Sequence, residues 1–272
     1  MDVSIIILNY KNKGLIQQEL KHFLSQKTSL RVEIIVVDND SHDGIGDMIA
    51  TDFPGVRFLA SPTNSGFAAG NNIGIRAAQG RYIMLVNPDL VLTAVMVEGL
   101  FQFMEASPTV GIVGPKLINA DGSLQYSCFR FPDFWVPFFR RTALARTAWG
   151  KKRVDEYFMK DWDYSAPRDV DWLLGACLMV RRTALDTVGY LDERFYMYVE
   201  DTDWCRRFWE KGYGVWYVPT VSVVHLHRRS SEGFLVSYLT KKTARDHLKS
   251  FFKYLIKYLG KKNPHTTYIG KE

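Results

Sequence analysis

Short apolar runs that alternate with amphipathic segments constrain the fold of this chain most. Residues 3–8 form a run rich in isoleucine, which is typical of a strand buried on both faces. Similar runs follow at residues 33–37, 56–59 and 82–86. Apolar residues recur at helical spacing over residues 15–24, 67–78 and 95–104. This order predicts an α/β fold with a mostly parallel sheet and helices on both faces.

The pattern changes in the second part of the chain. Asp121-Gly122 lies between two extended stretches and predicts a hairpin over residues 116–127. Residues 129–169 are irregular and rich in aromatic side chains. Beyond them we expect strands at 172–180 and 215–225 and helices at 182–188 and 201–211. We therefore divide the chain into residues 1–115, residues 116–230 of the same domain, and a tail at 231–272 with an amphipathic helix over 238–262.

Composition narrows the class of protein. Hydrophobic residues make up 47% of the chain and charged residues 24%, which is ordinary for a folded domain. The net charge of +6 suits a ligand that carries phosphate, a nucleic acid or an anionic membrane surface. The sequence contains no apolar run of about 18 residues, so no membrane span is expected. A strand pattern that begins at Val3, and an odd set of cysteines without C-x-x-C spacing, indicate a cytoplasmic protein with reduced thiols.

Polar residues follow three of the predicted strands. They are Asn9-Tyr10, Asp38-Asn39-Asp40 and Asn87-Pro88-Asp89. Each alone is an ordinary turn sequence. Because parallel strands end at one edge of a sheet, where α/β folds bind their ligands, all three together indicate a binding site.

Small and polar residues at 64–74 predict a second part of that site. Gly66 and Gly70 at a helix entrance allow close approach of backbone to a ligand, and a helix N-terminus favours phosphate. A helix cap with tight packing explains the same residues. The first turn, residues 9–14, contains one glycine only, so the dinucleotide fingerprint is missing and a nicotinamide enzyme is disfavoured.

Acidic residues and histidines mark two later segments. Glu200 and Asp201 begin a predicted helix, where a general base would be held rigidly and where acids also cap helices. Asp203 and Arg207 are spaced as a structural i,i+4 pair. His225 and His227 fall on one face of an extended segment, and imidazole joins carboxylates in Mn²⁺ sites.

With these segments in this order, the chain resembles the inverting family 2 glycosyltransferases of the GT-A fold, and most closely their rhamnosyltransferase-like branch. The likeness extends over residues 3–230. It rests on residues 4–10, 36–39, 64–74, 87–89, 175–176 and 195–207, and on His225.

The resemblance implies a role for each site residue. Residues 1–115 become the half that binds a nucleotide-diphosphate sugar donor, and residues 116–230 the half with the acceptor site and the base. Asp38 is implied to meet the nucleobase edge. The remaining nucleotide-sugar-binding residues implied are Asn9, Tyr10, Asn39, Asn64, Gly66, Asn71 and Asn87. Phosphate or acceptor contacts are implied for Arg228, Arg229, Trp172 and Gly175.

The resemblance also implies a metal and a base. Asp89, the last acid of a D-x-D-type motif whose first position here is Asn87, would bind Mn²⁺ or Mg²⁺ with His225. Asp201, with Glu200 beside it, would act as the catalytic base. Arg228 and Arg229 stand where the family often has glycines, so the local loop differs.

The resemblance suggests deoxythymidine diphosphate rhamnose as the donor, followed by uridine diphosphate hexoses. The acceptor would be a saccharide or a lipid-linked saccharide of a bacterial surface polysaccharide. The basic tail has its apolar residues at Phe251, Phe252, Leu255, Ile256 and Leu259. It suits an anionic membrane, the domain itself or a homodimer contact.

Other classes of protein fit less well. A non-catalytic nucleotide- or carbohydrate-binding protein would not need the acids and His225 together. A nucleotidyltransferase should carry a basic glycine-rich first turn, which residues 9–14 do not supply. Nucleic-acid binding rests on the tail alone and is disfavoured.

Overall fold

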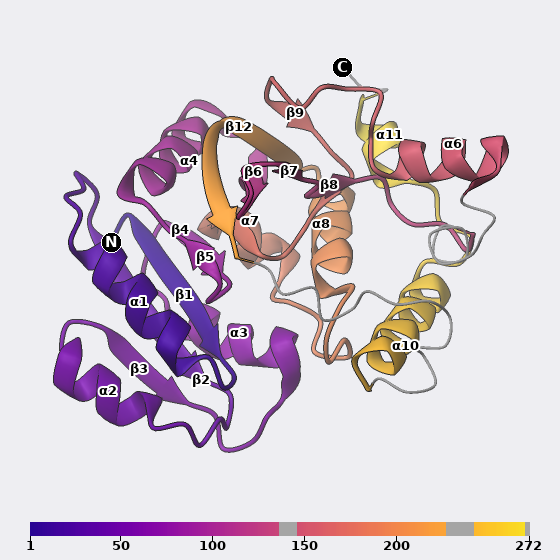
Figure 1. Ribbon diagram of the computed structural model, residues 1–272. Coiled ribbons are helices and arrows are strands. Elements are labelled where there is room, and N and C mark those ends of the chain that lie inside the picture. Colours follow the sequence, from indigo (N-terminus) through magenta and orange to yellow (C-terminus); the bar gives the residue numbers. More distant parts are fainter. Residues whose placement is uncertain (136–145, 227–241, 270–272) are drawn as a thin grey trace.

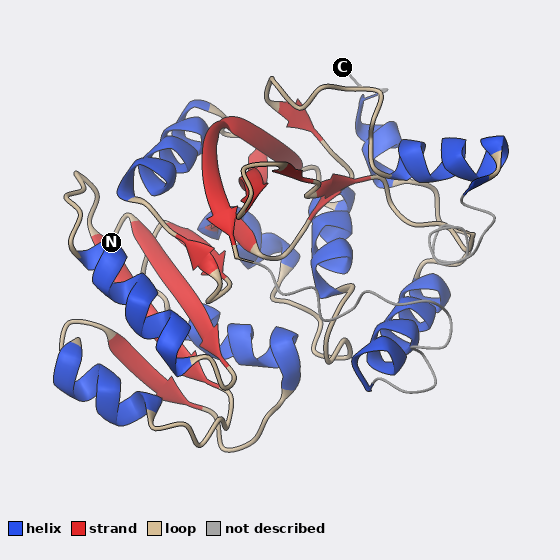
Figure 2. Cartoon of the chain, in the orientation of Figure 1, coloured by secondary structure: helices blue, strands red, loops and turns tan. Residues whose placement is uncertain are grey.

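The computed structural model describes residues 1–135, 146–226 and 242–269 of the 272. A single large mixed sheet runs through the molecule, with strand order β3-β2-β1-β4-β11-β6-β12-β5 (Figures 1 and 2). The four strands at one end of this order are parallel. They are β1 (Val3–Asn9), β2 (Val32–Asp38), β3 (Arg57–Ala60) and β4 (Tyr82–Val86). The predicted α/β fold is confirmed.

Three helices connect these strands: α1 (Lys13–Leu24), α2 (Ile45–Asp52) and α3 (Gly66–Ala77). A fourth helix, α4 (Ala94–Ala106), follows them and leads into the second half. Helix α2 was not predicted from the sequence, because it is a short helix that follows a polar stretch resembling a turn. Its apolar residues Ile45, Met48 and Ile49 are all buried.

The second half adds strands of both directions. β11 (Cys177–Arg181) lies antiparallel between β4 and β6 (Val110–Asn119). β12 (Gly214–His225) runs parallel to β6, and its end pairs with β5 (Leu90–Val91). The predicted hairpin is confirmed, since β7 (Leu124–Gln125) pairs antiparallel with β6 around Asp121-Gly122. Thus His225 at the end of β12 is brought beside the segment that carries Asp89.

Two predictions for this half were wrong in detail. The expected strand at 172–180 is broken: β10 (Trp172–Leu173) pairs with β8 (Cys128–Phe129) in a separate small sheet, and β11 begins only at Cys177. Between them the chain bends past a helix, where the Gly175 amide binds a side chain instead of a strand. The stretch expected to be irregular contains α6 (Ala148–Tyr157) and β9 (Arg168–Asp169).

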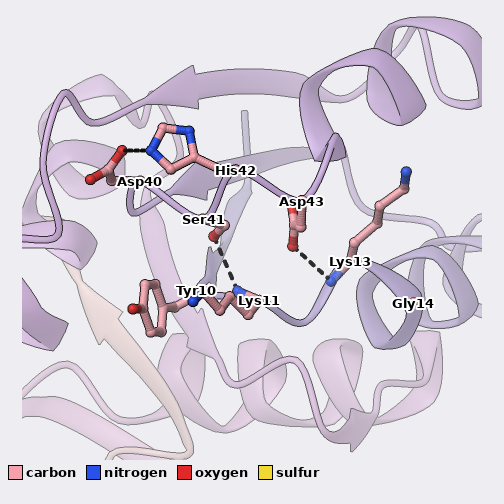
Figure 3. Close-up of a pocket in the computed structure, with 8 residues that line it drawn as sticks. All are labelled: Tyr10, Lys11, Lys13, Gly14, Asp40, Ser41, His42 and Asp43. Atoms are coloured by element: carbon pink, nitrogen blue, oxygen red, sulfur yellow. Dashed lines mark hydrogen bonds and ion pairs between the residues drawn. The ribbon is translucent and has the colours of Figure 1, made fainter.

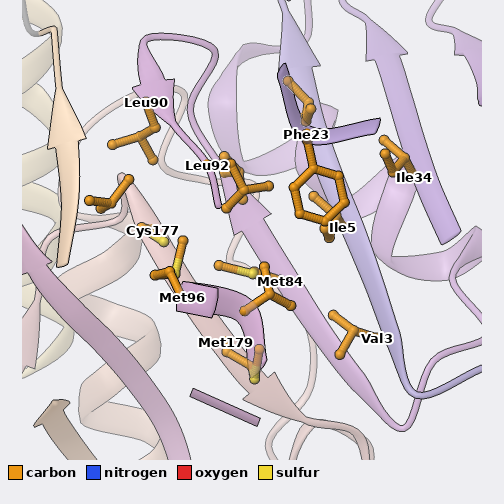
Figure 4. Packing of buried hydrophobic residues seen from close by; sticks show 14 of the residues in the cluster. Val3, Ile5, Phe23, Ile34, Met84, Leu90, Leu92, Met96, Cys177 and Met179 are labelled. Atoms are coloured by element: carbon orange, nitrogen blue, oxygen red, sulfur yellow. The ribbon is translucent and has the colours of Figure 1, made fainter. Parts of the chain in front are cut away.

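Alternate residues of the strands face two separate cores. Ile5 and Ile7 of β1 lie in the core beneath α1, α2 and α4 (Figure 4), whereas Ile6 lies in the core beneath α3, α7 (Arg182–Val188) and α8 (Glu200–Glu210). Helices therefore cover both faces of the sheet, as predicted. The three cysteines are buried free thiols within these cores, also as predicted.

The tail forms α10 (Lys242–Lys257) and α11 (Pro264–Ile269), which lie beyond α8, away from β3 (Figure 1). The predicted helix is confirmed, and one of its sides packs on the domain. Phe251, Tyr254 and Tyr258 are buried there, whereas Phe252, Ile256 and Leu259 remain exposed. No helix within the described residues is both long enough and apolar enough to cross a bilayer.

His265 fastens α11 to the domain. Its side chain is buried, with Nδ1 2.6 Å from an oxygen of Asp171 and Nε2 2.8 Å from an oxygen of Asp169. Both ring nitrogens face carboxylate oxygens, so both must donate, which only the protonated imidazole can do. Burial alone lowers the pKa of His265, but the hydrogen bonds to the two aspartates outweigh it and raise the pKa above 6.5.

This geometry predicts a pH-dependent contribution to stability. At about pH 6 we expect His265→Gln to lower the free energy of unfolding by about 2 kcal/mol, because it removes a charged hydrogen-bond donor from the buried Asp171 and from Asp169, and Arg130 at 3.4 Å is then the cation left beside Asp171. Since the folded pKa is raised, this contribution is complete below the unfolded value near 6.5 and is lost as pH rises through the folded pKa.

Urea unfolding of wild type and His265→Gln at several values between about pH 6 and about pH 9 measures the difference in the free energy of unfolding. His22→Gln is the control, because His22 is exposed. A difference that stays constant over this range contradicts the prediction.

Candidate active site

An open cavity of about 740 Å³ lies at the carboxyl ends of β1 and β2 (Figure 3). It is lined by Tyr10, Lys11, Lys13, Gly14, Asp40, Ser41, His42 and Asp43. Lys11, Asp40 and His42 have φ of 59°, 62° and 53°, in the left-handed region that non-glycine residues seldom adopt. Such strained backbone is concentrated at functional sites. Two lysines and an exposed tyrosine ring give this cavity the groups that a nucleotide needs.

Asn9 holds the wall of this cavity together. Its side chain is fully buried, and Nδ2 donates to Asp38 Oδ1 at 2.8 Å, Ser41 Oγ at 2.9 Å and Asp43 Oδ2 at 3.1 Å. Asp38 is only partly buried. The sequence analysis placed Asn9, Tyr10 and Asp38 at one edge, and the structure brings them together. Direct contact of each with a nucleotide stays a prediction.

Asn39, Asn64 and Gly66 form a brace beside β2. Asn39 is buried, and its Nδ2 donates to Asn64 Oδ1 and to the Gly66 carbonyl, both at 3.1 Å. A Cβ on Gly66, whose φ is +89°, would lie 2.2 Å from the Tyr196 carbonyl, so only glycine fits. That carbonyl accepts the Phe67 amide at 2.7 Å. The entrance of α3 is thus bound by protein, which favours the packing explanation over a phosphate site.

Asn71 has a similar local role. Its side chain is buried within α3 and donates to the Phe67 carbonyl at 2.9 Å. The predicted contact of Asn71 with the nucleotide stays untested by this arrangement.

Asp89 and His225 form the candidate metal centre. His225 Nε2 lies 3.2 Å from Asp89 Oδ1, and Nδ1 lies 2.9 Å from Gln125 Oε1. Because an amide oxygen only accepts, Nδ1 donates to Gln125, and with an ion bound the Nε2 lone pair would face that ion beside Asp89. A carboxylate oxygen and an imidazole nitrogen suit Mn²⁺, so the residues present fit the ion. Within the described ranges no set of three or more His, Cys, Asp or Glu side chains could hold a metal, so further ligands would have to come from elsewhere.

A short run of contacts joins this centre to Asp201. The Asn87 amide donates to the Ala176 carbonyl at 2.9 Å, and the Gly175 amide donates to Asp201 Oδ2 at 2.8 Å. A Cβ on Gly175 would approach Asp201 Cβ to 3.2 Å, so glycine permits the close contact. Both the 87–89 segment and Asp201 are therefore bonded to the bend at residues 174–176, between β10 and β11.

Glu200 and Asp201 are neighbouring carboxyls in different surroundings. Both are buried. Asp201 accepts from the Gly175 amide and, at 2.7 Å, from the Thr202 amide, whereas Glu200 Oε2 has no hydrogen-bond partner. Burial and then the charge of Asp201 raise the pKa of Glu200 well above its usual range. Burial also raises the pKa of Asp201, but the hydrogen bonds from Gly175 and Thr202 oppose it. These surroundings favour Asp201 as the ionised member of the pair and Glu200 as the member that keeps a proton.

The remaining predicted contacts are scattered or not described. Trp172 is buried, stacks on Phe129 at 4.4 Å and donates to the Arg130 carbonyl. Arg228, Arg229 and His227 lie outside the described residues. The structural pair predicted for Asp203 and Arg207 is confirmed, with Nε 2.8 Å from Oδ2.

Several residues at the site were not found from the sequence. Lys11, Lys13, Ser41 and Asp43 line the cavity, and Gln125 orients His225 across 100 residues. The two lysines of the first turn were visible as a signal, since cations beside strand ends suit phosphate. Nothing in the sequence pattern pointed to Gln125.

Comparison with known proteins identifies the class. The sequence profile of Glycosyl transferase family 2 matches residues 4–160, more than half of the chain. This chain therefore belongs to glycosyl transferase family 2 and is an enzyme of that class, as the sequence predicted.

Its curated relatives include rhamnosyltransferases. The N-acetylglucosaminyl-diphospho-decaprenol L-rhamnosyltransferase of Mycobacterium tuberculosis is 30% identical over 229 residues, or 77% of this chain and 71% of that protein. Rhamnosyltransferase WbbL of Escherichia coli K12 is 25% identical and covers 93% of this chain and 92% of its own length. The chain is thus a rhamnosyltransferase-like member of the family.

Solved structures show the same fold. Mannosyltransferase PcManGT from Pyrobaculum calidifontis, in complex with GDP-Man and Mn²⁺, matches 98% of this chain and 68% of that chain, with a TM-score of 0.62 and 18% identity. TarS 1-349 of S. aureus, in complex with UDP-GlcNAc, matches 96% of this chain and 67% of that chain, with a TM-score of 0.62 and 16% identity. The predicted GT-A fold is confirmed.

Proposed function

We propose that this enzyme is a metal-dependent inverting glycosyltransferase that moves rhamnose from a deoxythymidine diphosphate donor to a saccharide or lipid-linked saccharide in bacterial surface polysaccharide synthesis. The observation that carries the proposal is the continuous run of contacts from Asp89 and His225, through Asn87 and Ala176, to Gly175 and Asp201. These contacts connect the proposed metal ligands and the proposed base to the same backbone segment, Gly175-Ala176. The names of the rhamnosyltransferase relatives support the sugar and the lipid-diphosphate acceptor.

The donor would lie along the carboxyl ends of the strands. Its nucleoside would occupy the cavity lined by Tyr10, next to the Asn9–Asp38 hydrogen bond, and Lys11 and Lys13 would attract its phosphates. The diphosphate would then reach Asp89 and His225, which would hold Mn²⁺ or Mg²⁺. When bound, such an ion supplies Lewis-acid stabilisation of the charge that grows on the leaving diphosphate.

Asp201 would remove the proton from the acceptor hydroxyl. The acceptor oxygen forms its bond to the anomeric carbon while the bond from that carbon to the diphosphate oxygen breaks, and the hydroxyl proton moves to Asp201. A single displacement from the opposite face inverts the anomeric configuration. Glu200, which is neutral, keeps a second negative charge away from the site.

Exchanging each acid for its amide separates the two roles. We expect Asp201→Asn to lower kcat at least about a hundredfold, which is typical of losing a general base. Glu200→Gln replaces a neutral acid by a neutral amide of the same shape, so we expect near-normal turnover at neutral pH. Because the pKa of Asp201 is raised, wild-type kcat should fall on acidification at a pH above the ordinary aspartate value of 3.8.

Steady-state assays with dTDP-rhamnose and Mn²⁺ measure these effects, and donor binding by each variant is the control for folding. Normal turnover by Asp201→Asn, or equal losses in both variants, contradicts the assigned roles. A wild type that processes UDP-hexoses and not dTDP-rhamnose corrects the donor and leaves the assignment of the base intact.

Removing Asp89 tests the metal centre. We expect Asp89→Ala to lose the strengthening of donor binding by Mn²⁺, because one of two protein ligands is gone. Calorimetric titration of dTDP with and without Mn²⁺ measures the effect, and EDTA should reduce wild type to the affinity of the variant. Asp186→Ala is the control, since Asp186 is an exposed acid of α7. Equal dTDP affinity of wild type with and without EDTA contradicts the proposal.

We further propose that the exposed side of α10 contacts the membrane that carries the acceptor. Phe252 and Ile256 of α10 and Leu259 in the turn after it are 47%, 75% and 83% exposed. The basic residues Arg245, Lys249 and Lys253 of the same helix are also exposed. An apolar strip flanked by cations suits the surface of an anionic bilayer.

Vesicle flotation tests this contact. Wild type should float with phosphatidylglycerol vesicles and not with neutral ones, and Ile256→Ser with Leu259→Ser should weaken flotation about tenfold or more. Val95→Ser is the matched control, because Val95 is an exposed apolar residue on α4. Absence of wild-type flotation, or a change from dimer to monomer in the variant, contradicts the membrane assignment.

A further inference from the structure

The inner side of α10 packs on the segment that leads into Glu200 and Asp201. Phe195 and Val199 of that segment share one buried cluster with Phe251, Tyr254 and Tyr258 of the tail. The tail therefore covers the five residues that precede the acid pair, although it lies about fifty residues further along the chain.

Polar contacts attach the same two segments at intervals. Ser250 Oγ donates to the Met197 carbonyl at 2.9 Å, and Lys253 Nζ donates to the Arg194 carbonyl at 2.7 Å. The Tyr198 ring lies 4.9 Å from the imidazole of His247. These bonds engage the backbone of the segment, so they fix its path as well as its side chains.

The covered segment contains strained backbone. Tyr198 and Val199 have φ of 68° and 71°, and Val199 is the cap residue from which α8 starts. A β-branched residue in the left-handed region is a genuine outlier and persists only where its surroundings enforce it. Release of this turn would alter the direction in which Glu200 and Asp201 enter the site.

A second attachment holds α8 itself. Asp203 is completely buried two residues after Asp201, and its Oδ1 accepts from Lys257 Nζ at 2.5 Å and from the Tyr258 hydroxyl at 2.7 Å. Lys257 also binds Asp192 at 2.8 Å, at the other end of the covered segment. Lys257 therefore bonds to one acid before the strained turn and to one acid after it.

We propose that α10 positions the catalytic acid pair, and that Lys257 and Tyr258 are positioning residues that act through Asp203 on Asp201. This inference rests on the proposed function of Asp201 as the base. It gives the inner side of the tail a part in the reaction that is separate from any contact made by its outer side.

The kinetic test uses Lys257→Met and Tyr258→Phe, which keep the packing bulk and remove the bonds to Asp203. The assay is hydrolysis of dTDP-rhamnose with Mn²⁺, in which Asp201 takes the proton of a water that attacks the anomeric carbon. We expect kcat to fall about ten- to hundredfold with the KM for donor unchanged, because small misplacements of a reacting group have effects of this size.

Matched variants make the result specific. Lys21→Met makes the same chemical change at an exposed position of α1 and should leave kcat unchanged. Tyr258→Phe added to Asp201→Asn should cause no further loss, because residues that act through one another are not additive. We call Lys257→Met and Tyr258→Phe the clamp variants. The inference is overturned if both have normal kcat, or if the double variant loses kcat by the product of the two single losses.

Hydrogen exchange provides a reading that does not depend on the donor. The Asp203 amide bonds to the Val199 carbonyl at 2.9 Å in the first turn of α8. Its exchange should quicken in Lys257→Met and Tyr258→Phe and stay unchanged in Lys21→Met. Unaltered exchange in the clamp variants overturns the inference, even if wild type is inactive on every sugar nucleotide tried. That inactivity alone would instead contradict the proposed function.

Discussion

The hydrogen bond from the Gly175 amide to the Asp201 carboxylate is the contact on which the site depends. It is buried and 2.8 Å long, and it joins the first turn of α8 to the bend between β10 and β11. The next residue of that bend, Ala176, accepts the Asn87 amide. Through two adjacent peptide units, the sheet fixes where the acid lies relative to the Asp89 segment. The predicted 172–180 strand is broken here, because the Gly175 amide bonds to Asp201 and the Ala176 carbonyl bonds to Asn87.

The same bond helps to divide the labour of two adjacent acids. Two buried carboxyls cannot both ionise cheaply, so one keeps a proton. Asp201 accepts hydrogen bonds from two backbone amides and the Thr202 hydroxyl, which stabilise its charge. Glu200 Oε2 accepts none. A helix N-terminus adds a favourable field for a single negative charge. The two carboxyls therefore differ in their surroundings, which suits Asp201 for the proposed role of base, although the sequence shows only Glu-Asp.

The sequence predicted those features that depend on local pattern. The parallel strands, the two-sided helices, the 121–122 hairpin, the helix at Glu200 and the Asp203–Arg207 pair all follow from residues close together in the chain. It could not predict that Lys257 and Tyr258 share Asp203, since they lie 54 and 55 residues away. Nor does alternation reveal that the side chains of Asn39 and Asn71 donate to backbone carbonyls within the fold.

A crystal structure of the protein with Mn²⁺ and dTDP would test most directly whether the parts of the site act together. The account predicts the ion at Asp89 and His225, the diphosphate on that ion, and the thymine in the cavity beside Tyr10 and Asp38. Density for the ion or the nucleotide anywhere else, with Asp89 and Asp38 left untouched, would contradict it.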